Sequence, residues 1–300
     1  MIHYADTQNL TGYDQENIYY ETMNWISNNV KKLNMVYLSH LGDVTQNNTV
    51  KEWEIAKKGF DMIQGKLPYN IALGNHDYPS PSHGVGAEFR DETNFKNCFP
   101  YDWYMEGYTD ASQGGTFEED NAVNVYKCVK VGDIEYIMFA LEFGPRDEVL
   151  DWVSEVLKQY PNKKAIISTH SYYTRDGQLT TFEAQKYGGY FKDGNEGIDI
   201  WNKLVKKHEN IVLVNCGHSM GTQSQQHESL NKFGGKVVQI MADPSSMVKW
   251  PDDNGLIMIF AFTNEGTMHT YYYSPYKDMY YGTVNECTYD MSKALGIVNE

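Results

Sequence analysis

The 300-residue sequence has no long apolar run, no internal repeat and no low-complexity tract, so it offers neither a membrane-spanning segment nor a repeat architecture. Basic residues are also few: 25 Lys and Arg stand against 40 Asp and Glu, and the formal net charge is -15. Because proteins that bind nucleic acid usually gather Lys and Arg into clusters, we do not expect a nucleic-acid partner.

Cysteine is scarce as well. The four cysteines lack Cys-x-x-Cys spacing, which argues against a zinc knuckle and against a redox pair. They are Cys98, Cys128, Cys216 and Cys287. An even number permits disulfides in a secreted protein without requiring them. No signal peptide is recognisable and the first apolar stretch is only residues 1–5, so we expect that an amino-terminal segment has been lost. The compartment and the oligomeric state stay open.

Length and composition favour one α/β domain with decorations. A chain of 300 residues with 41% hydrophobic content can bury a full core. Apolar residues recur at helical spacing in four segments, residues 13–32, 50–63, 146–160 and 198–207. The carboxyl-terminal third is instead rich in strand-like runs, at residues 236–242, 255–263 and 267–273. We interpret the helical stripes as core faces and the late strands as part of a second sheet.

The most informative motif is Gly74-Asn75-His76-Asp77, which follows an apolar, strand-like stretch at residues 69–73. An asparagine carbonyl is a hard oxygen ligand for a divalent cation, and a neighbouring histidine can transfer a proton near neutral pH. Taken alone, the four residues are more typical of an ordinary turn.

The same arrangement recurs along the chain. Four further apolar stretches, residues 1–5, 34–41, 164–169 and 210–216, are followed by Asp6 and Gln8, by Asp43, by His170 and by His218, respectively. In an open α/β sheet, ligands bind at the carboxyl ends of the strands, so these side chains are expected to converge.

This ordered set resembles the calcineurin-like metallophosphoesterase family, whose pattern is Asp-x-His, Gly-Asp, Gly-Asn-His-Asp/Glu, His and Gly-His-x-His. The resemblance spans residues 6–218, and it is closest to the branch that carries Asp-x-Gln in the first motif. Residues 141–145 and 168–172 also look similar to that branch. The resemblance implies a four-layer α/β/β/α sandwich, with two mixed sheets flanked by helices, and a metal-dependent phosphoester hydrolase.

The resemblance also implies roles for individual residues. Two divalent cations, Mn, Fe, Zn or Mg, would lie about 3.5–4 Å apart and share Asp43. Asn75, His170 and His218 would complete one site, whereas Asp6 and Gln8 would belong to the other. Water activated by the cations would attack the phosphorus of a small phosphorylated substrate, either a monoester or a diester. His76 would then protonate the leaving oxygen, and Asp77 is a candidate to orient His76.

The chain departs from the family pattern at two positions. Gln8 offers an amide oxygen where most relatives have an imidazole, and Met220 stands where the last family histidine is expected. Since a thioether is a poor ligand for Mg²⁺ or Mn²⁺, the site of Asp6 and Gln8 should be the weaker of the two. His227 or His40 is a candidate substitute for the missing ligand.

Two other functions compete with this interpretation. Gly217-His218-Ser219-Met220-Gly221 matches the Gly-x-Ser-x-Gly nucleophile elbow of serine hydrolases, in which Ser219 would attack an ester. The polar segment after Ser219 is a poor match for the helix that an elbow requires. The departures at Gln8 and Met220 also allow a non-catalytic binding module on a degenerate metallophosphoesterase scaffold.

The remaining expectations concern domain limits and substrate contacts. Residues 1–275 would form the metallophosphoesterase domain, with residues 78–121 as inserted substrate-rim loops and residues 276–300 as a carboxyl-terminal extension. Five aromatic residues in the insertion would either line the substrate rim or cap the core; they are Phe99, Tyr101, Trp103, Tyr104 and Tyr108. Beyond His170, Tyr172 and Arg175 are candidate substrate-binding residues, although an arginine on a loop is more often simply exposed to solvent.

Overall fold

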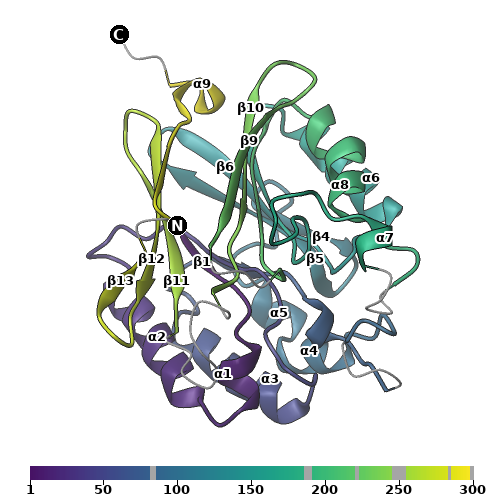
Figure 1. Cartoon of the computed structure of the whole chain (residues 1–300), viewed down its shortest axis with the longest axis vertical. Coiled ribbons are helices and arrows are strands. Elements are labelled where there is room, and N and C mark those ends of the chain that lie inside the picture. Colours follow the sequence, from purple (N-terminus) through teal and green to yellow (C-terminus); the bar gives the residue numbers. More distant parts are fainter. Residues whose placement is uncertain (82–85, 186–190, 220–222, 245–254, 283–284, 298–300) are drawn as a thin grey trace.

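A computed structural model describes residues 1–81, 86–185, 191–219, 223–244, 255–282 and 285–297. Two mixed β-sheets form the centre of this part of the chain, and helices flank them on both sides (Figure 1). The four-layer α/β/β/α sandwich predicted from the sequence is therefore confirmed.

The first sheet combines strands from both ends of the chain. Its order is β13-β12-β11-β1-β2-β3, with β14 also paired to β12. The strands are β1 (Ile2–Tyr4), β2 (Leu38–His40), β3 (Tyr69–Ile71), β11 (Ile257–Phe262), β12 (Thr267–Ser274), β13 (Met279–Tyr281) and β14 (Cys287–Asp290). Because β1, β2 and β3 run parallel, their carboxyl ends lie at one edge of the sheet.

The second sheet comes from the middle of the chain, in the order β4-β5-β6-β7-β8-β10-β9. The strands are β4 (Gly114–Glu118), β5 (Asn121–Val131), β6 (Ile134–Ala140), β7 (Lys164–Ser168), β8 (Ile211–Cys216), β9 (Gln225–Leu230) and β10 (Lys236–Met241). Strands β6, β7, β8 and β10 are parallel to one another. Their carboxyl ends therefore also share an edge.

The helices form the outer layers. They are α1 (Gln8–Gly12), α2 (Glu16–Asn29), α3 (Val50–Asp61), α4 (Thr93–Cys98), α5 (Tyr101–Tyr104), α6 (Asp147–Gln159), α7 (Phe182–Gln185), α8 (Gly197–Lys203) and α9 (Ser292–Leu295), with 3₁₀ turns η1 (Asn75–Asp77) and η3 (Val205–Lys207). In Figure 1, α1, α2 and α3 lie beside the first sheet, whereas α6 and α8 lie beside the second. Among the described residues, no helix combines the length and the apolar character needed to cross a bilayer.

Three hydrophobic clusters fill the spaces between these four layers. Trp53 of α3 belongs to the cluster between the first sheet and its helices. Val153 of α6 belongs to the cluster under the second sheet. Ile166 and Met258 belong to a third cluster, in which side chains of the two sheets meet. Burial of this apolar surface is the main favourable term in holding the layers together.

The predicted helices at residues 50–63 and 146–160 correspond closely to α3 and α6. The start of α3 is fixed by a capping box: Glu52 N–H donates to Thr49 Oγ1, and the Glu52 carboxylate accepts from Thr49 N–H. This cap marks the end of the loop that carries Asp43 and the start of α3.

The segment at residues 78–121 contains α4, α5 and β4, and its aromatic side chains pack onto the core of the first sheet. Phe99 and Tyr104 are fully buried, whereas Tyr101, Trp103 and Tyr108 are partly buried against the same cluster. Of the two alternatives for these residues, capping of the core fits their burial better than lining a substrate rim.

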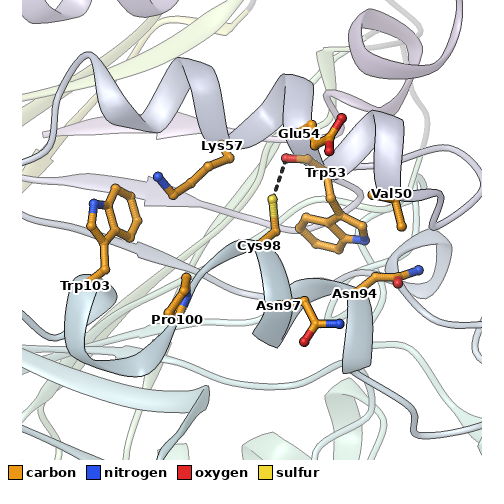
Figure 2. A pocket seen from close by; sticks show the side chains of 9 residues that line it. All are labelled: Val50, Trp53, Glu54, Lys57, Asn94, Asn97, Cys98, Pro100 and Trp103. Carbon is orange, nitrogen blue, oxygen red and sulfur yellow. Dashed lines mark hydrogen bonds between the residues drawn. The ribbon is translucent and has the colours of Figure 1, made fainter.

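A hollow of about 450 Å³ lies between α3 and the α4–α5 segment (Figure 2). Lys57 Nζ sits 3.6 Å above the centre of the Trp103 ring on one side of it. On the other side, the Cys98 thiol donates to the Trp53 carbonyl over 3.1 Å. Burial raises the pKa of Cys98 to about 11, so this thiol is a weak nucleophile. None of the strand-end residues singled out from the sequence lines the hollow.

The end of the described chain completes the first sheet. Residues 279–281 form β13 and residues 287–290 form β14, and both strands pair antiparallel to β12. The expected carboxyl-terminal extension at residues 276–300 is therefore joined to the core by main-chain hydrogen bonds in its described part.

Lys127 of β5 is an unusual feature of the core, because its side chain is buried without a carboxylate in hydrogen-bonding range among the described residues. Its ammonium donates to the carbonyls of Tyr69 (3.0 Å) and Tyr104 (2.8 Å). The rings of Tyr69, Tyr104 and Tyr108 surround it at 4.2 to 5.1 Å. Burial lowers the pKa of Lys127 from 10.5 to about 7.

This buried lysine should make stability depend on pH. Between about pH 7 and about pH 10, the unfolded chain holds a proton on Lys127 that the folded chain has released, so the free energy of unfolding should rise with pH. In Lys127→Met this part of the rise should disappear, whereas Lys130→Met, on the exposed side of β5, should retain it. Urea unfolding at a series of pH values measures both, and equal slopes in the two variants would contradict the prediction.

Candidate active site

The side chains predicted from the strand ends meet where the carboxyl edges of the two sheets come together. Asp6, Asp43 and His218 each follow a strand, and all three have positive φ angles, of 56°, 49° and 71°. Such angles are uncommon outside glycine and are often held in place at functional sites. Gly42 has a φ of 97°, and a Cβ there would lie 2.6 Å from His170 Nδ1. Only glycine allows the loop to approach that histidine so closely.

Four side chains converge on one point, and we call them the histidine-rich set: Asp43, Asn75, His170 and His218. His170 Nε2 lies 3.2 Å from Asp43 Oδ1, 3.2 Å from Asn75 Oδ1 and 3.2 Å from His218 Nδ1. The ligand atoms of Asp43, His170 and His218 all lie within 4.8 Å of one another. One carboxylate oxygen, one amide oxygen and two imidazole nitrogens suit a divalent transition metal.

The tautomer of His170 supports this interpretation. Its Nδ1–H donates to the Leu41 carbonyl over 2.7 Å, which leaves Nε2 as the ring nitrogen directed at the other ligands. Burial lowers the pKa of His170, but the Asp43 carboxylate, the hydrogen bond to the Leu41 carbonyl and the Asp77 carboxylate together outweigh burial, so the net shift is upward. Burial, with the neighbouring His170, lowers the pKa of His218 to about 3. The surroundings of His170 therefore favour a positive charge between its ring and Asp43. His218 stays neutral and can coordinate a metal ion.

Asp6 and Gln8, with the second oxygen of Asp43, form what we call the oxygen-ligand set. Gln8 Nε2 lies 3.3 Å from Asp43 Oδ2, and Gln8 Oε1 is buried with no hydrogen-bond partner among the described residues. Oxygen and nitrogen of an amide are assigned from their contacts, so a bound cation would turn the oxygen toward Asp43. Asp6 accepts from His218 N–H over 3.1 Å.

The charge around Asp6 also points to a cation. Burial raises the pKa of Asp6, and the carboxylates of Asp243 and Asp43 raise it further, against the opposing hydrogen bond from His218 N–H. Buried like charges of this kind need a compensating positive charge. Both sets thus fit divalent cations by their donor chemistry.

His76 lies beside the shared carboxylate and is only half-buried. Its main-chain N–H donates to Asp43 Oδ1 over 2.9 Å, and its Nδ1–H donates to the Gln46 carbonyl over 2.8 Å. That second bond fixes the ring and leaves Nε2 as the nitrogen that can exchange a proton with a substrate. Nothing in the sequence indicated that Gln46 would hold the His76 ring.

Asp77 does not hold the His76 ring. Its carboxylate instead accepts from Gly74 N–H (2.8 Å), Val44 N–H (3.1 Å) and Thr45 N–H (2.8 Å), and from the Thr45 hydroxyl (2.9 Å). Burial and then Asp43 raise the pKa of Asp77, and the backbone N–H groups oppose them. Asp77 therefore ties the loop after β2 to the turn after β3, which positions Asp43 relative to Asn75.

Neither His40 nor His227, the candidate substitutes for the missing family histidine, directs a nitrogen at the oxygen-ligand set in its contacts among the described residues. His40 Nδ1 accepts from Gly42 N–H over 3.3 Å and its Nε2 contacts Thr7 Oγ1 at 3.0 Å, so both nitrogens are engaged within the fold. His227 lies on β9 against the Tyr173 ring, with 4.8 Å between ring centres. Met220 lies outside the described residues.

The serine-hydrolase alternative and the two substrate-binding candidates can also be located. Ser219 Oγ donates to the Tyr173 carbonyl over 2.6 Å, and the next described element is strand β9 rather than the helix of a nucleophile elbow. Tyr172 is fully buried and its hydroxyl donates to Gln239 Oε1 over 2.7 Å, so it belongs to the core and does not fit a substrate contact. Arg175 is exposed, on a turn between Thr174 and Gln178.

Besides Gln46, two residues beside the centre were not predicted as site residues, although one of them, Phe143, lies in the stretch 141–145 that resembles the family branch. Asp243 lies two residues after strand β10 and directly follows the strand-like stretch predicted at residues 236–242, so the strand-end argument that found the other acids could have found this one. Phe143 follows β6, and its ring lies 5.9 Å from that of His170 and 5.7 Å from that of His218. It forms an apolar wall against the two imidazoles.

Comparisons with known proteins agree with this geometry. The profile of the calcineurin-like phosphoesterase family matches residues 1–221, and the chain belongs to that family. An uncharacterised protein of Bacillus subtilis, YvnB, is 26% identical over 86% of this chain. A probable glycerophosphodiester phosphodiesterase of Arcobacter nitrofigilis, GpdQ, is 23% identical over 59% of it. These matches cover 19% and 54% of the two relatives, respectively.

The fold is also similar to that of a purple acid phosphatase from yellow lupin. That structure superposes with a TM-score of 0.56 at 12% identity, over 96% of this chain and 52% of the lupin chain. At so low an identity the similarity concerns the fold alone.

Asp77→Asn tests the role of the loop-tying carboxylate. An amide NH₂ in place of one oxygen would face main-chain N–H donors, so the two loops should separate. We expect Mn²⁺ affinity to fall about 10–100-fold and the free energy of unfolding to fall by about 1–3 kcal/mol. Calorimetric titration and urea unfolding measure the two effects, with Asp102→Asn as an exposed control. Slower turnover with unchanged metal affinity would instead support the role predicted from the sequence, orientation of His76.

Proposed function

We propose that this chain hydrolyses a small phosphomonoester or phosphodiester in a reaction that depends on two divalent cations. The observation that carries the proposal is the position of Asp43. One of its oxygens faces His170 at 3.2 Å, and the other faces Gln8 at 3.3 Å. A carboxylate whose two oxygens face two different donor sets has the geometry needed to bridge two cations.

The cations, when bound, would lower the pKa of a water molecule and neutralise the phosphoryl oxygens. The residues of the chain then have separate tasks. The histidine-rich set would hold one cation through nitrogen and oxygen atoms, and the oxygen-ligand set would hold the other. Phe143 excludes water from one side of the imidazoles, which strengthens electrostatic interactions in the centre.

His76 is the residue best placed to supply a proton to the leaving oxygen. It is held by Gln46 on one nitrogen, lies next to Asp43 through its own main chain, and is half-exposed. General acid catalysis by a positioned histidine typically contributes about 10²–10⁴-fold to the rate. Asp77 does not contact the His76 ring; it positions Asp43 and Asn75 by holding together the loops that carry them.

The substrate is limited to a class. The chain is acidic, with a net charge of -15, which disfavours nucleic acid as a substrate. We therefore propose a small phosphorylated molecule as the substrate. One relative is described as a probable glycerophosphodiester phosphodiesterase, so a small diester is a reasonable first substrate to test. Arg175 is proposed to approach a substrate phosphate from its exposed turn.

The alternative, a non-catalytic binding module, is favoured by Met220 at the family histidine position. Such a module has no need for a histidine beside the shared carboxylate, whereas His76 is held there by hydrogen bonds. Turnover of a generic aryl phosphate with added Mn²⁺ distinguishes the two functions.

Asp43→Asn tests the shared carboxylate. Replacing one oxygen by NH₂ removes a contact to one cation and a negative charge from both, so activity should fall at least about 100-fold. Turnover of aryl phosphomonoesters and diesters, with Mn²⁺ or with a chelator, measures the loss. Asp102→Asn, an exposed carboxylate on α5, is the matched control.

Ser219→Ala completes this experiment, because it should retain full activity. Full activity in Asp43→Asn, or in exhaustively chelated protein, would refute the proposed function. Loss of activity in Ser219→Ala alone would favour the nucleophile elbow.

The proton-donating role of His76 has its own test. In His76→Asn, hydrolysis of substrates with alkyl leaving groups should slow by about 10²–10⁴-fold. Substrates with an activated aryl leaving group should slow far less, since such a group needs little protonation. Comparing kcat for the two substrate types measures the difference. Equal losses on both would assign His76 a structural role.

A further inference from the structure

Arg90 joins three segments that are far apart in the sequence. Its guanidinium donates to the carbonyls of Phe143 (3.2 Å) and Gly144 (2.8 Å), in the loop after β6. It also donates to the two carboxylate oxygens of Asp193, over 3.4 Å and 3.1 Å. The loop that contains Asp193 is thereby joined to the loop that carries Phe143, beside the histidine-rich set.

The main chains of these two loops are also in direct contact. A Cβ at Gly194 would lie 2.8 Å from the Gly144 carbonyl oxygen, so a side chain there would collide with the facing loop. At the next residue, the Asn195 main-chain N–H donates to the Pro145 carbonyl over 3.0 Å, and its side-chain amide donates to the same carbonyl over 2.8 Å. Several contacts therefore fix residues 191–195 relative to the loop after β6.

Phe191 is the aromatic side chain that these contacts hold in place. The Arg90 guanidinium lies 4.0 Å from the centre of its ring. The same ring lies 6.1 Å from that of Phe143 and 5.1 Å from that of Tyr78. Phe143 in turn packs against both imidazoles of the histidine-rich set. A single ring therefore separates Phe191 from the candidate metal ligands.

Phe191 is also the member of this group that a substrate can reach. Phe143 and Tyr78 are 2% and 1% exposed, whereas Phe191 is only partly buried. The Arg90 side chain makes four hydrogen bonds to described residues, and its Nη1 also lies 3.5 Å from the buried Glu142 carboxylate. Since a guanidinium has five N–H groups, Arg90 has little left for a substrate phosphate. The contact offered on this side of the centre is therefore apolar.

We propose that Phe191 is a specificity-determining residue, which contacts an apolar group carried by the substrate, and that Arg90 is its positioning residue. This inference rests on the proposed phosphoesterase function and narrows the substrate class to phosphoesters with an apolar substituent, such as a benzyl group. The contact removes apolar surface of the substituent from water, and one such contact typically discriminates between substrates by about 10-fold or more.

The test compares kcat and KM for benzyl and ethyl esters of phosphate, as monoesters and as diesters, with added Mn²⁺. The two alcohols have similar acidity, so the esters differ mainly in apolar surface. In the wild type, kcat/KM should be at least about 10-fold higher for the benzyl ester. Phe191→Ala should lower this value by at least about 10-fold, through KM, and affect the ethyl ester far less. Phe233→Ala, an exposed phenylalanine between β9 and β10, is the matched control.

Arg90→Lys tests the positioning role. Lysine keeps the positive charge but cannot reproduce the forked contacts of a guanidinium. The variant should therefore lose the preference for the benzyl ester as Phe191→Ala does, again through KM. Equal losses on both esters in the two variants would assign Arg90 and Phe191 a structural role and overturn the proposal, as would a wild type that does not distinguish the esters.

Binding of phosphonates separates this inference from the proposed function, because a phosphonate has no ester bond to hydrolyse. In calorimetric titrations with Mn²⁺ present, the wild type should bind benzylphosphonate at least about 10-fold more tightly than ethylphosphonate, and Phe191→Ala should lose the difference. This result without turnover of any ester would refute the proposed function and retain the role of Phe191. Turnover with equal binding of the two phosphonates would do the reverse.

Discussion

The Asp43 carboxylate is the contact on which the rest of the centre depends. It follows β2 in the first sheet, and its Oδ1 lies 3.2 Å from His170, which follows β7 in the second. The same oxygen accepts the main-chain N–H of His76, and Oδ2 faces Gln8. The backbone supports this position through Gly42, through the positive φ of Asp43, and through Asp77, which joins the two flanking loops. One side chain thus sets where both donor sets and the candidate acid lie.

The charge balance explains why these positions are coupled. Asp6, Asp43, Asp77 and Asp243 are all at least 96% buried. Asp77 is satisfied by three N–H groups and a hydroxyl, and Asp43 by His170 and His76. Among the described residues, Asp6 accepts the His218 N–H and lies near further negative charge. Divalent cations would compensate this excess, so the site and its metals form one electrostatic unit.

Much of this could be predicted from the sequence, because a polar residue after an apolar stretch marks the carboxyl end of a strand. That rule located Asp6, Asp43, Asn75, His170 and His218, and it would have located Asp243. It could not resolve side-chain direction within a motif. The Asp77 side chain points toward the two loops and the Tyr172 side chain points into the core. The neighbouring residues in the sequence do not indicate these directions. Strand β4 was missed because residues 78–121 were predicted to be loops, and no strand was predicted at residues 122–140, where β5 and β6 lie.

The division of ligands between the sheets has a further consequence. β1, β2 and β3 of the first sheet lead to Asp6, Asp43 and Asn75, whereas β7 and β8 of the second lead to His170 and His218. Elsewhere the sheets are joined mainly by apolar side chains, with a few polar contacts such as that of Lys127 to the Tyr69 carbonyl, but at this edge polar groups predominate. A cation bound only by the folded chain adds stability with concentration, about 2.7 kcal/mol at a hundred times Kd. Here that energy would join two sheets, so metal binding and the packing of the sandwich must depend on each other.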